Sequence, residues 1–187
     1  VFHTASPFFL DSKDAQKELI DPAFEGTRNV LDSVNKTPSV KRVVLTSSVA
    51  AIYGDTIDSK NVPDGIFDES AWNTSSTPTQ SEYSYSKTIA EKEAWKICGE
   101  QNSWDLVVIN PSLVLGPALN PHSYFEIKKF MLNMSNGDIK SGVQDINLGI
   151  VDVRNVGEAQ DILEATKKSK GIFQLASNHR FFESVMY

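Results

Sequence analysis

Arg42-Val43-Val44-Leu45-Thr46-Ser47-Ser48 joins an apolar, β-branched run to two adjacent serines. The run over residues 42–46 predicts a strand that is buried on both faces, as the strands of parallel sheets are. A second run of the same kind, Asp105-Leu106-Val107-Val108-Ile109-Asn110, is ended by Pro111. Residues 171–176 predict a third, shorter strand. Parallel neighbours in one sheet need crossover connections, so the segments between these strands should contain helices.

The segments around these strands have the character of helices and one long loop. Helices are predicted over residues 11–35, 83–102, 125–134 and 155–168. Pro22 must lie at a bend or at a helix start within the first of them. Residues 53–81 are rich in Asp, Pro, Ser and Thr and predict a long loop, which in compact domains is often functional. The order of elements predicts an α/β fold, with a parallel sheet and helices on its faces.

Tyr83 and Lys87 stand four residues apart at the start of the second predicted helix. Positions i and i+4 share a helix face, so the ammonium and the phenol can share one site. A free tyrosine titrates near pH ~10, and a cation at ~4 Å in an effective dielectric of ~20 is worth roughly 4 kcal/mol. Such a cation could lower the tyrosine pKa by up to ~3 units. The pair alone is weak evidence, because short motifs recur by chance and an exposed tyrosine beside a solvated lysine is the alternative.

Polar groups from several elements are expected to meet at one edge of the sheet. In parallel α/β sheets, ligands bind beyond the carboxyl ends of the strands. Ser47 and Ser48 follow one strand, Ser112 follows another, and the helix that begins at Tyr83 can line the same crevice. A serine hydroxyl there could hydrogen-bond a substrate carbonyl oxygen. Serine, tyrosine and lysine together suit carbonyl reduction or alcohol oxidation, in which a proton moves while a cofactor transfers the hydride.

Composition argues against several other classes of protein. The 187 residues are 40% hydrophobic and 22% charged, as in one soluble domain of ordinary size. The net charge of −6 argues against nucleic-acid and membrane partners, and there is no apolar run of ~18 residues. Cys98 is the only cysteine, which favours a reducing, cytoplasmic location. His3, His122 and His179 lack metal-ligand spacing, so we expect no metal site. The oligomeric state is left open.

A series of motifs runs in order along nearly the whole chain. They are Val1-Phe2-His3-Thr4-Ala5-Ser6-Pro7, Glu25-Gly26-Thr27-Arg28-Asn29-Val30-Leu31, the 42–48 stretch, Asp68-Glu69-Ser70-Ala71-Trp72, Tyr83-Ser84-Tyr85-Ser86-Lys87-Thr88-Ile89-Ala90-Glu91, Ile109-Asn110-Pro111-Ser112-Leu113-Val114-Leu115-Gly116-Pro117 and Val151-Asp152-Val153-Arg154-Asn155-Val156-Gly157-Glu158-Ala159. The series resembles the extended short-chain dehydrogenase/reductase family. The likeness is greatest to its dihydroflavonol reductase, cinnamoyl-CoA reductase and yeast methylglyoxal/aldehyde reductase branch. This resemblance implies a Rossmann-type, doubly wound parallel sheet and an NAD(P)-dependent oxidoreductase.

The resemblance also implies roles for individual residues. Tyr83 would be the catalytic acid/base, and Lys87 would lower its pKa and bind the nicotinamide ribose. Ser48 would hold the substrate oxygen, with Ser47 as the alternative. The residues implied in cofactor binding are Ala5, Ser6, Pro7, Thr46, Ser47, Tyr83, Lys87, Pro111 and Ser112. The implied cofactor is NADP, with NAD as a second possibility, and the implied substrate is a small-molecule carbonyl compound.

The sequence departs from the family pattern in three places. It contains no glycine-rich G-x-x-G-x-x-G phosphate loop, and the region that selects NAD or NADP is also absent. Gln160 stands where the branch usually has histidine, a change that we interpret as peripheral. We expect residues 1–187 to be a fragment of a single NAD(P)-binding Rossmann-like domain that lacks its N-terminal glycine-rich strand-turn-helix unit. Parts of the substrate-binding region are expected at about 115–150 and 177–187.

Three functions follow as hypotheses. The motifs favour NAD(P)H-dependent reduction of a ketone or aldehyde to an alcohol, with Tyr83 as proton donor. A nucleotide-sugar epimerase or dehydratase of the same superfamily would use the same three catalytic residues. The missing phosphate loop leaves a third hypothesis open, a non-catalytic fragment or cofactor-sensing relative.

Overall fold

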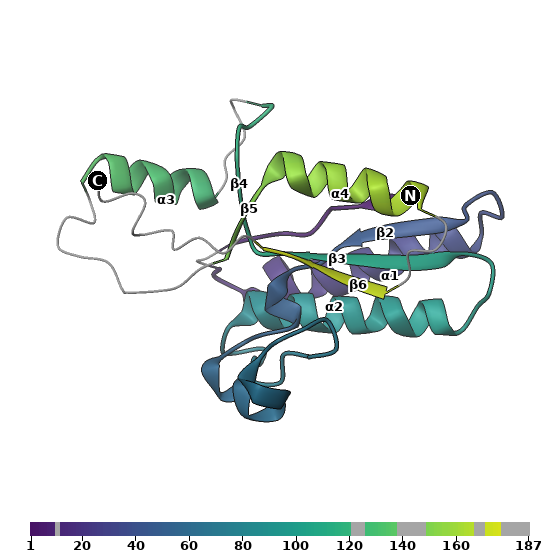
Figure 1. The fold of residues 1–187 in the computed structure, drawn as a ribbon, viewed down its shortest axis with the longest axis horizontal. Coiled ribbons are helices and arrows are strands. Elements are labelled where there is room, and N and C mark those ends of the chain that lie inside the picture. The colour runs from purple at the N-terminus through teal and green to yellow at the C-terminus, as the bar shows by residue number, and fades with distance from the viewer. Residues whose placement is uncertain (10–11, 121–125, 138–148, 167–170, 177–187) are drawn as a thin grey trace.

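A four-stranded parallel sheet forms the centre of the computed structural model, which describes residues 1–9, 12–120, 126–137, 149–166 and 171–176 (Figure 1). The strand order is β1-β2-β3-β6. The strands span β1 (Phe2–His3), β2 (Arg42–Thr46), β3 (Asp105–Pro111) and β6 (Gly171–Leu175). In register, Thr46 of β2 lies opposite Ile109 of β3. A second parallel pair, β4 (Leu113–Leu115) and β5 (Ile150–Asp152), follows the carboxyl end of β3.

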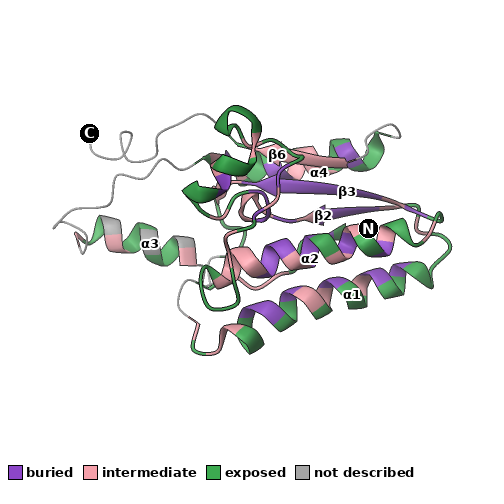
Figure 2. Cartoon of the chain, turned by 90° about the horizontal axis from the view of Figure 1, so that it is seen from below, coloured by how far each residue is buried: buried purple, intermediate pink, exposed green. Residues whose placement is uncertain are grey.

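Helices cover both faces of this sheet. The helices are α1 (Asp21–Asn35), α2 (Glu82–Gly99), α3 (Glu126–Ser135) and α4 (Val153–Ala165). Helices α1 and α2 lie side by side against one face, and α4 lies against the other (Figures 1 and 2). Successive residues of β3 alternate between the two cores, since Val108 packs in the α1–α2 cluster and Val107 in the α4 cluster. The expected α/β, doubly wound Rossmann-type fold is therefore confirmed.

Most element boundaries agree with the predicted ones, and the differences have local causes. The first predicted helix is split, because a π-helical turn (Gln16–Ile20) precedes α1, whose first turn contains Pro22. Proline lacks an N–H group, so it is tolerated at a helix start and not inside one. Helix α4 begins earlier than predicted because the Asp152 carboxylate accepts a hydrogen bond from Arg154 N at 2.8 Å. The expected substrate segment 177–187 lies outside the described residues.

The segment 53–81, predicted as a long loop, contains two short 3₁₀ helices, Thr56–Asn61 and Pro63–Gly65. Asp58 is buried in it, and only 2% of the residue is exposed. Its carboxylate accepts hydrogen bonds from Gly54 N, Asp55 N, Thr74 Oγ1 and Ser75 Oγ at 2.7–3.3 Å. Burial alone would raise the pKa of Asp58, but these hydrogen bonds outweigh it and the pKa is lowered. The loop is therefore held by an ionised side chain, which the composition of the segment did not reveal.

Asp58→Ala is expected to destabilise the protein by about 2–4 kcal/mol, because it leaves several buried donors without an acceptor. Because the folded-state pKa is lowered, this stabilisation is present above about pH 4 and is lost as the pH falls through the folded-state pKa. Urea unfolding at pH 7 measures the loss. Asp68→Ala is the matched control, because Asp68 is an exposed carboxylate of the same segment. Equal stability of the two variants would contradict the prediction.

Candidate active site

Ser48 and Tyr83 meet at the carboxyl end of β2. Ser48 has extended backbone angles and caps a short 3₁₀ helix, with its Oγ accepting a hydrogen bond from Ala50 N at 3.2 Å. Tyr83 lies in the first turn of α2, and its hydroxyl group is close enough to the Ser48 side chain for the serine to lower the pKa of the phenol. Of the two adjacent serines, Ser48 is thus the one that contacts the phenol. The ring of Phe8 packs edge-on against the Tyr83 ring, with centroids 4.7 Å apart.

Lys87 lies one helical turn after Tyr83 and is almost fully buried. Its Nζ donates a hydrogen bond to the Thr46 carbonyl oxygen at 3.2 Å, at the end of β2. Burial lowers the pKa of Lys87 to about 8, and the negative charge of Glu91 acts in the opposite direction. A buried lysine of this kind carries its charge at neutral pH and loses it slightly above.

The expected direction of the Tyr83 pKa is wrong for this structure. We expected Lys87 to lower it, yet burial raises the pKa of Tyr83 above its ordinary value, and the Ser48 hydrogen bond only partly offsets this effect. The physical reason is that burial disfavours the phenolate, while the nearest partner of the Lys87 ammonium is the Thr46 carbonyl. The phenol is therefore protonated at neutral pH.

A buried polar network lies beneath these groups. Asn110, at the end of β3, donates from Nδ2 to Ser48 O at 2.9 Å and to Glu91 Oε2 at 2.8 Å. Glu91 is 1% exposed and follows Lys87 by one helical turn. Ser47 Oγ approaches the Glu91 carboxylate without the geometry of a full hydrogen bond, and among the groups that lower the pKa of Glu91 it acts most strongly. Glu91 belongs to the motif that begins at Tyr83, and its place in the sequence alone indicated no role for it.

The residues predicted to bind a cofactor lie around this edge. Ala5 is exposed, and Ser6 and Pro7 are half-buried in the chain that follows β1. The Oγ atoms of Ser6 and Ser112 are both buried without a hydrogen-bond partner among the described residues. Such unpaired groups are uncommon in folded proteins and call for an explanation. Pro111, the last residue of β3, pairs with Leu175 of β6.

Gln160 is closer to the site than we expected. Its Nε2 on α4 donates to Thr46 Oγ1 at 2.7 Å. The interpretation of Gln160 as peripheral is therefore wrong, because the side chain fixes the same residue whose carbonyl group holds Lys87. Only the packing of α4 against β2 brings these positions, 114 residues apart, together.

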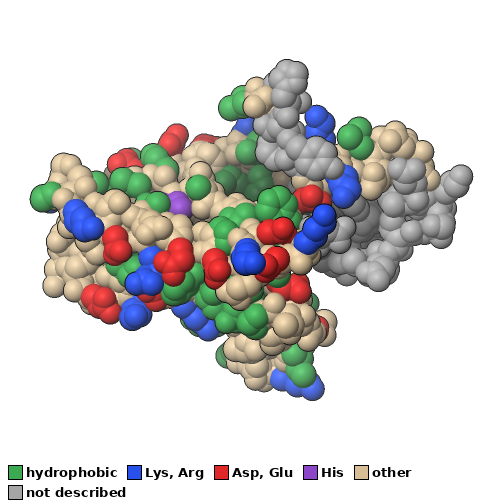
Figure 3. All heavy atoms as spheres, turned by 180° about the vertical axis from the view of Figure 1, so that it is seen from behind, with side chains coloured by type: hydrophobic (Ala, Val, Ile, Leu, Met, Phe, Trp, Pro, Cys, Tyr) green, Lys and Arg blue, Asp and Glu red, His purple; other side chains and the backbone are tan. Residues whose placement is uncertain are grey.

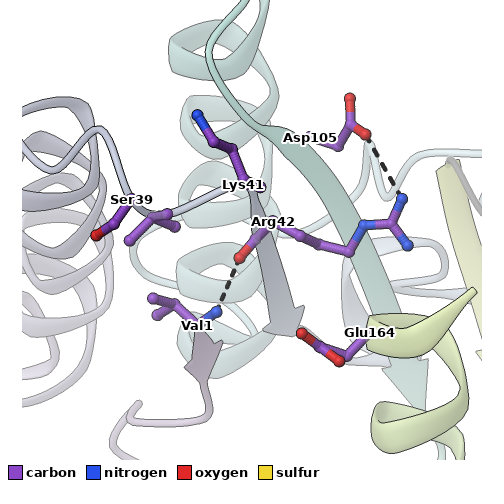
Figure 4. A pocket seen from close by; sticks show the side chains of 7 residues that line it. Val1, Ser39, Lys41, Arg42, Asp105 and Glu164 are labelled. Carbon is purple, nitrogen blue, oxygen red and sulfur yellow. Dashed lines mark hydrogen bonds and ion pairs between the residues drawn. The ribbon is translucent and has the colours of Figure 1, made fainter. Parts of the chain in front are cut away.

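Features elsewhere in the described part of the chain give no second candidate for an active site. One hollow lies at the amino ends of the strands, and Figure 4 shows Arg42 paired there with Asp105, and Val1 N bonded to Arg42 O. Lys, Arg, Asp and Glu side chains are interspersed on the face drawn in Figure 3. Within the described ranges, no group of three or more His, Cys, Asp or Glu side chains could hold a metal ion. No described helix has the length and apolar character needed to cross a membrane.

Comparisons with known proteins agree with the motif analysis. The sequence profile of the NAD dependent epimerase/dehydratase family matches residues 1–175. The chain is 42% identical to cinnamoyl-CoA reductase CAD2 of Medicago truncatula over 91% of its own length and 51% of that protein. It is 35% identical to tetraketide alpha-pyrone reductase 1 of Arabidopsis thaliana, over 95% of this chain and 54% of that protein.

A solved structure shows the same fold. Yeast methylglyoxal/isovaleraldehyde reductase Gre2, complexed with NADPH, superposes with a TM-score of 0.79 and 29% identity, over 94% of this chain and 55% of that one. The chain thus spans about half the length of the relatives it matches. The resemblance that the motifs indicated is confirmed, and the chain belongs to the NAD-dependent epimerase/dehydratase family of extended short-chain dehydrogenases/reductases.

Proposed function

We propose that this chain carries the catalytic part of an NADPH-dependent reductase that converts a ketone or aldehyde to an alcohol. The observation that carries the proposal is the contact between the Tyr83 hydroxyl group and the Ser48 side chain, one helical turn from the buried Lys87. All three groups lie at the carboxyl edge of a parallel sheet, where ligands of such folds bind. The two relatives described above are named as reductases, which favours this reaction over others of the family.

The residues at this edge fit the nicotinamide half of a dinucleotide. The buried, unpaired hydroxyl groups of Ser6 and Ser112 could hydrogen-bond a carboxamide or a ribose, and Lys87 offers a cation for the ribose hydroxyls. NADPH is the cofactor in the solved structure of yeast Gre2, and when bound it supplies the hydride. The choice of NADPH over NADH is part of the proposal. In this proposal the proton comes from Tyr83.

Tyr83 and Ser48 have different roles at the substrate oxygen. Both hydroxyl groups can donate hydrogen bonds to the carbonyl oxygen, which orients and polarises it. As negative charge develops on that oxygen, Tyr83 transfers its phenolic proton to it and becomes a phenolate. The raised pKa of Tyr83 suits this direction, because the phenol holds its proton at neutral pH. The Lys87 cation, one helical turn away, would favour the phenolate that is left and so oppose the burial that disfavours it.

Turnover by the complete natural protein tests the proposal. We expect oxidation of NADPH with a panel of aldehydes and ketones, and no conversion of UDP-sugars. UDP-sugar conversion without net consumption of NADPH would instead support the epimerase or dehydratase hypothesis, which relies on the same three residues. Binding of NADPH without any turnover would support the cofactor-sensing hypothesis. The variants described below then connect the activity to individual side chains.

A further inference from the structure

Tyr83, Lys87, Glu91 and Trp95 lie at successive turns of α2. The first of them, Tyr83, is at the carboxyl edge of the sheet, where the candidate active site lies. Residues spaced by four share one helix face. Glu91 is the most deeply buried of the charged side chains in this group, with 1% exposure. A buried carboxylate is costly unless it is paired or well hydrogen-bonded, so its presence directly behind Lys87 needs a physical account.

The hydrogen bonds of Glu91 are those of an ionised carboxylate. Asn110 Nδ2 donates to Oε2 at 2.8 Å, and Trp95 Nε1 donates to Oε1 at 3.3 Å. Both oxygens therefore accept from N–H groups, and neither needs a proton to be satisfied. Burial raises the pKa of Glu91, while Ser47, the Asn110 and Trp95 hydrogen bonds and, least, the Lys87 charge oppose that rise. Lys87 and Glu91 attract each other through the low-dielectric interior without a direct ion pair.

The same carboxylate fixes the amide of Asn110. Nδ2 of Asn110 points at two acceptors, Glu91 Oε2 and Ser48 O, and a flipped amide would bring its oxygen against both. Ser48 O is thereby held by a chain of contacts that begins at Glu91. Because the Ser48 side chain contacts Tyr83, Glu91 is connected to the proton donor through Asn110 and Ser48 as well as through Lys87.

We propose that Glu91 is a positioning residue for the reductase site, which keeps the Lys87 side chain charged and, through Asn110, holds the Ser48 segment in place. The catalytic part of this proposal rests on the proposed function, because a positioning role requires that the chain is a reductase. Its electrostatic part concerns two buried side chains and can be measured without any substrate.

Few other titratable groups face this pair. The small cavity beside it, about 10 Å³, is lined by His3 of β1, Thr27 of α1, and Lys87 and Glu91 of α2. Burial and the charge of Lys87 lower the pKa of His3, so this side chain is neutral near pH 7. Tyr83, the remaining titratable group on this face of α2, is protonated there. A change in the Lys87 titration on removal of the Glu91 charge would therefore report on this pair.

Glu91→Gln in the complete natural protein is the first test. Since Lys87 has a pKa of about 8, we expect the reduction rate to fall as the pH rises through that value in the wild type. This fall in rate is the basic limb of the pH profile. Loss of the negative charge of Glu91 should lower the pKa of Lys87 and so move the basic limb to lower pH by about one unit. Glu93→Gln is the matched control, because it removes a carboxylate from the same helix. The Glu93 carboxylate pairs with Arg28 and Lys96 and not with Lys87. An unmoved limb in a folded Glu91→Gln variant would overturn the proposal.

A thermal double-mutant cycle tests the pair without activity. It compares wild type, K87M, E91Q and the double variant at pH 7 and pH 9.5. At pH 7 the E91Q change should lower the Tm by a few degrees more in the wild-type background than in the K87M background, because only the former loses an attraction. At pH 9.5, where Lys87 is neutral, the difference should vanish. Additive Tm shifts at pH 7 would refute the charge coupling, even if the protein proved to have no reductase activity.

Discussion

Replacing Tyr83 with phenylalanine is expected to lower kcat for carbonyl reduction by at least ~10²-fold, the usual scale for a positioned acid or base. The substitution removes the transferable proton and the hydroxyl group that contacts Ser48, and it keeps the ring that packs against Phe8. The fold and the cofactor affinity should therefore change little. Steady-state kinetics in the complete natural protein, together with NADPH binding by calorimetry, measure both quantities.

Tyr85→Phe is the matched control for this experiment. Tyr85 belongs to the same helix but lies two residues further on, and so on another face of α2. Its hydroxyl group is not expected to reach the Ser48 site, and near-normal turnover should result. Near-normal turnover by Tyr83→Phe as well would remove the proton-donor role from Tyr83 and with it the proposed reaction.

The arrangement of the sheet was predictable because its strands carry a strong signal, continuous apolar and β-branched runs. Residues 43–45 and 106–109 are apolar without interruption, and the structure buries them between helices on both faces. The strands β4 and β5 were not predicted, because segments of three residues are too short for any period to show. The split before α1 depends on a π-helical turn, for which propensity gives no signal.

The site was predicted in part, for reasons that concern burial. Helical spacing and a strand end are local features, so the proximity of Tyr83, Lys87 and Ser48 follows from the sequence. A glutamate on a helix normally indicates a solvated face, and only the packing of α2 against the sheet shows that Glu91 is buried. The same omission explains the wrong sign for the Tyr83 pKa, since the sequence revealed the cation and not the desolvation.

Lys87→Met is expected to lower kcat/KM for carbonyl reduction by about 10²-fold or more. The variant loses the buried cation that would stabilise the Tyr83 phenolate and bind the cofactor ribose, and electrostatic contributions of this kind are worth about 10²–10³ in rate. Lys87 has a lowered pKa of about 8, so its charge is present below that pH and is lost as the pH rises through it. The basic limb of the wild-type pH profile near pH 8 should therefore be absent from Lys87→Met.

Lys92→Met provides the comparison that isolates this charge. Lys92 belongs to the same helix, but its ammonium is exposed and stacks 5.1 Å from the centroid of the Trp72 ring. Because this cation is exposed, Lys92→Met should have the same rate and the same pH profile as the wild type. NADPH affinity should fall in Lys87→Met and not in Lys92→Met, because only Lys87 lies at the carboxyl edge of β2, where its Nζ contacts Thr46 O. If Lys87→Met retained both the basic limb and the affinity, the limb would belong to another group and Lys87 would have only a structural role.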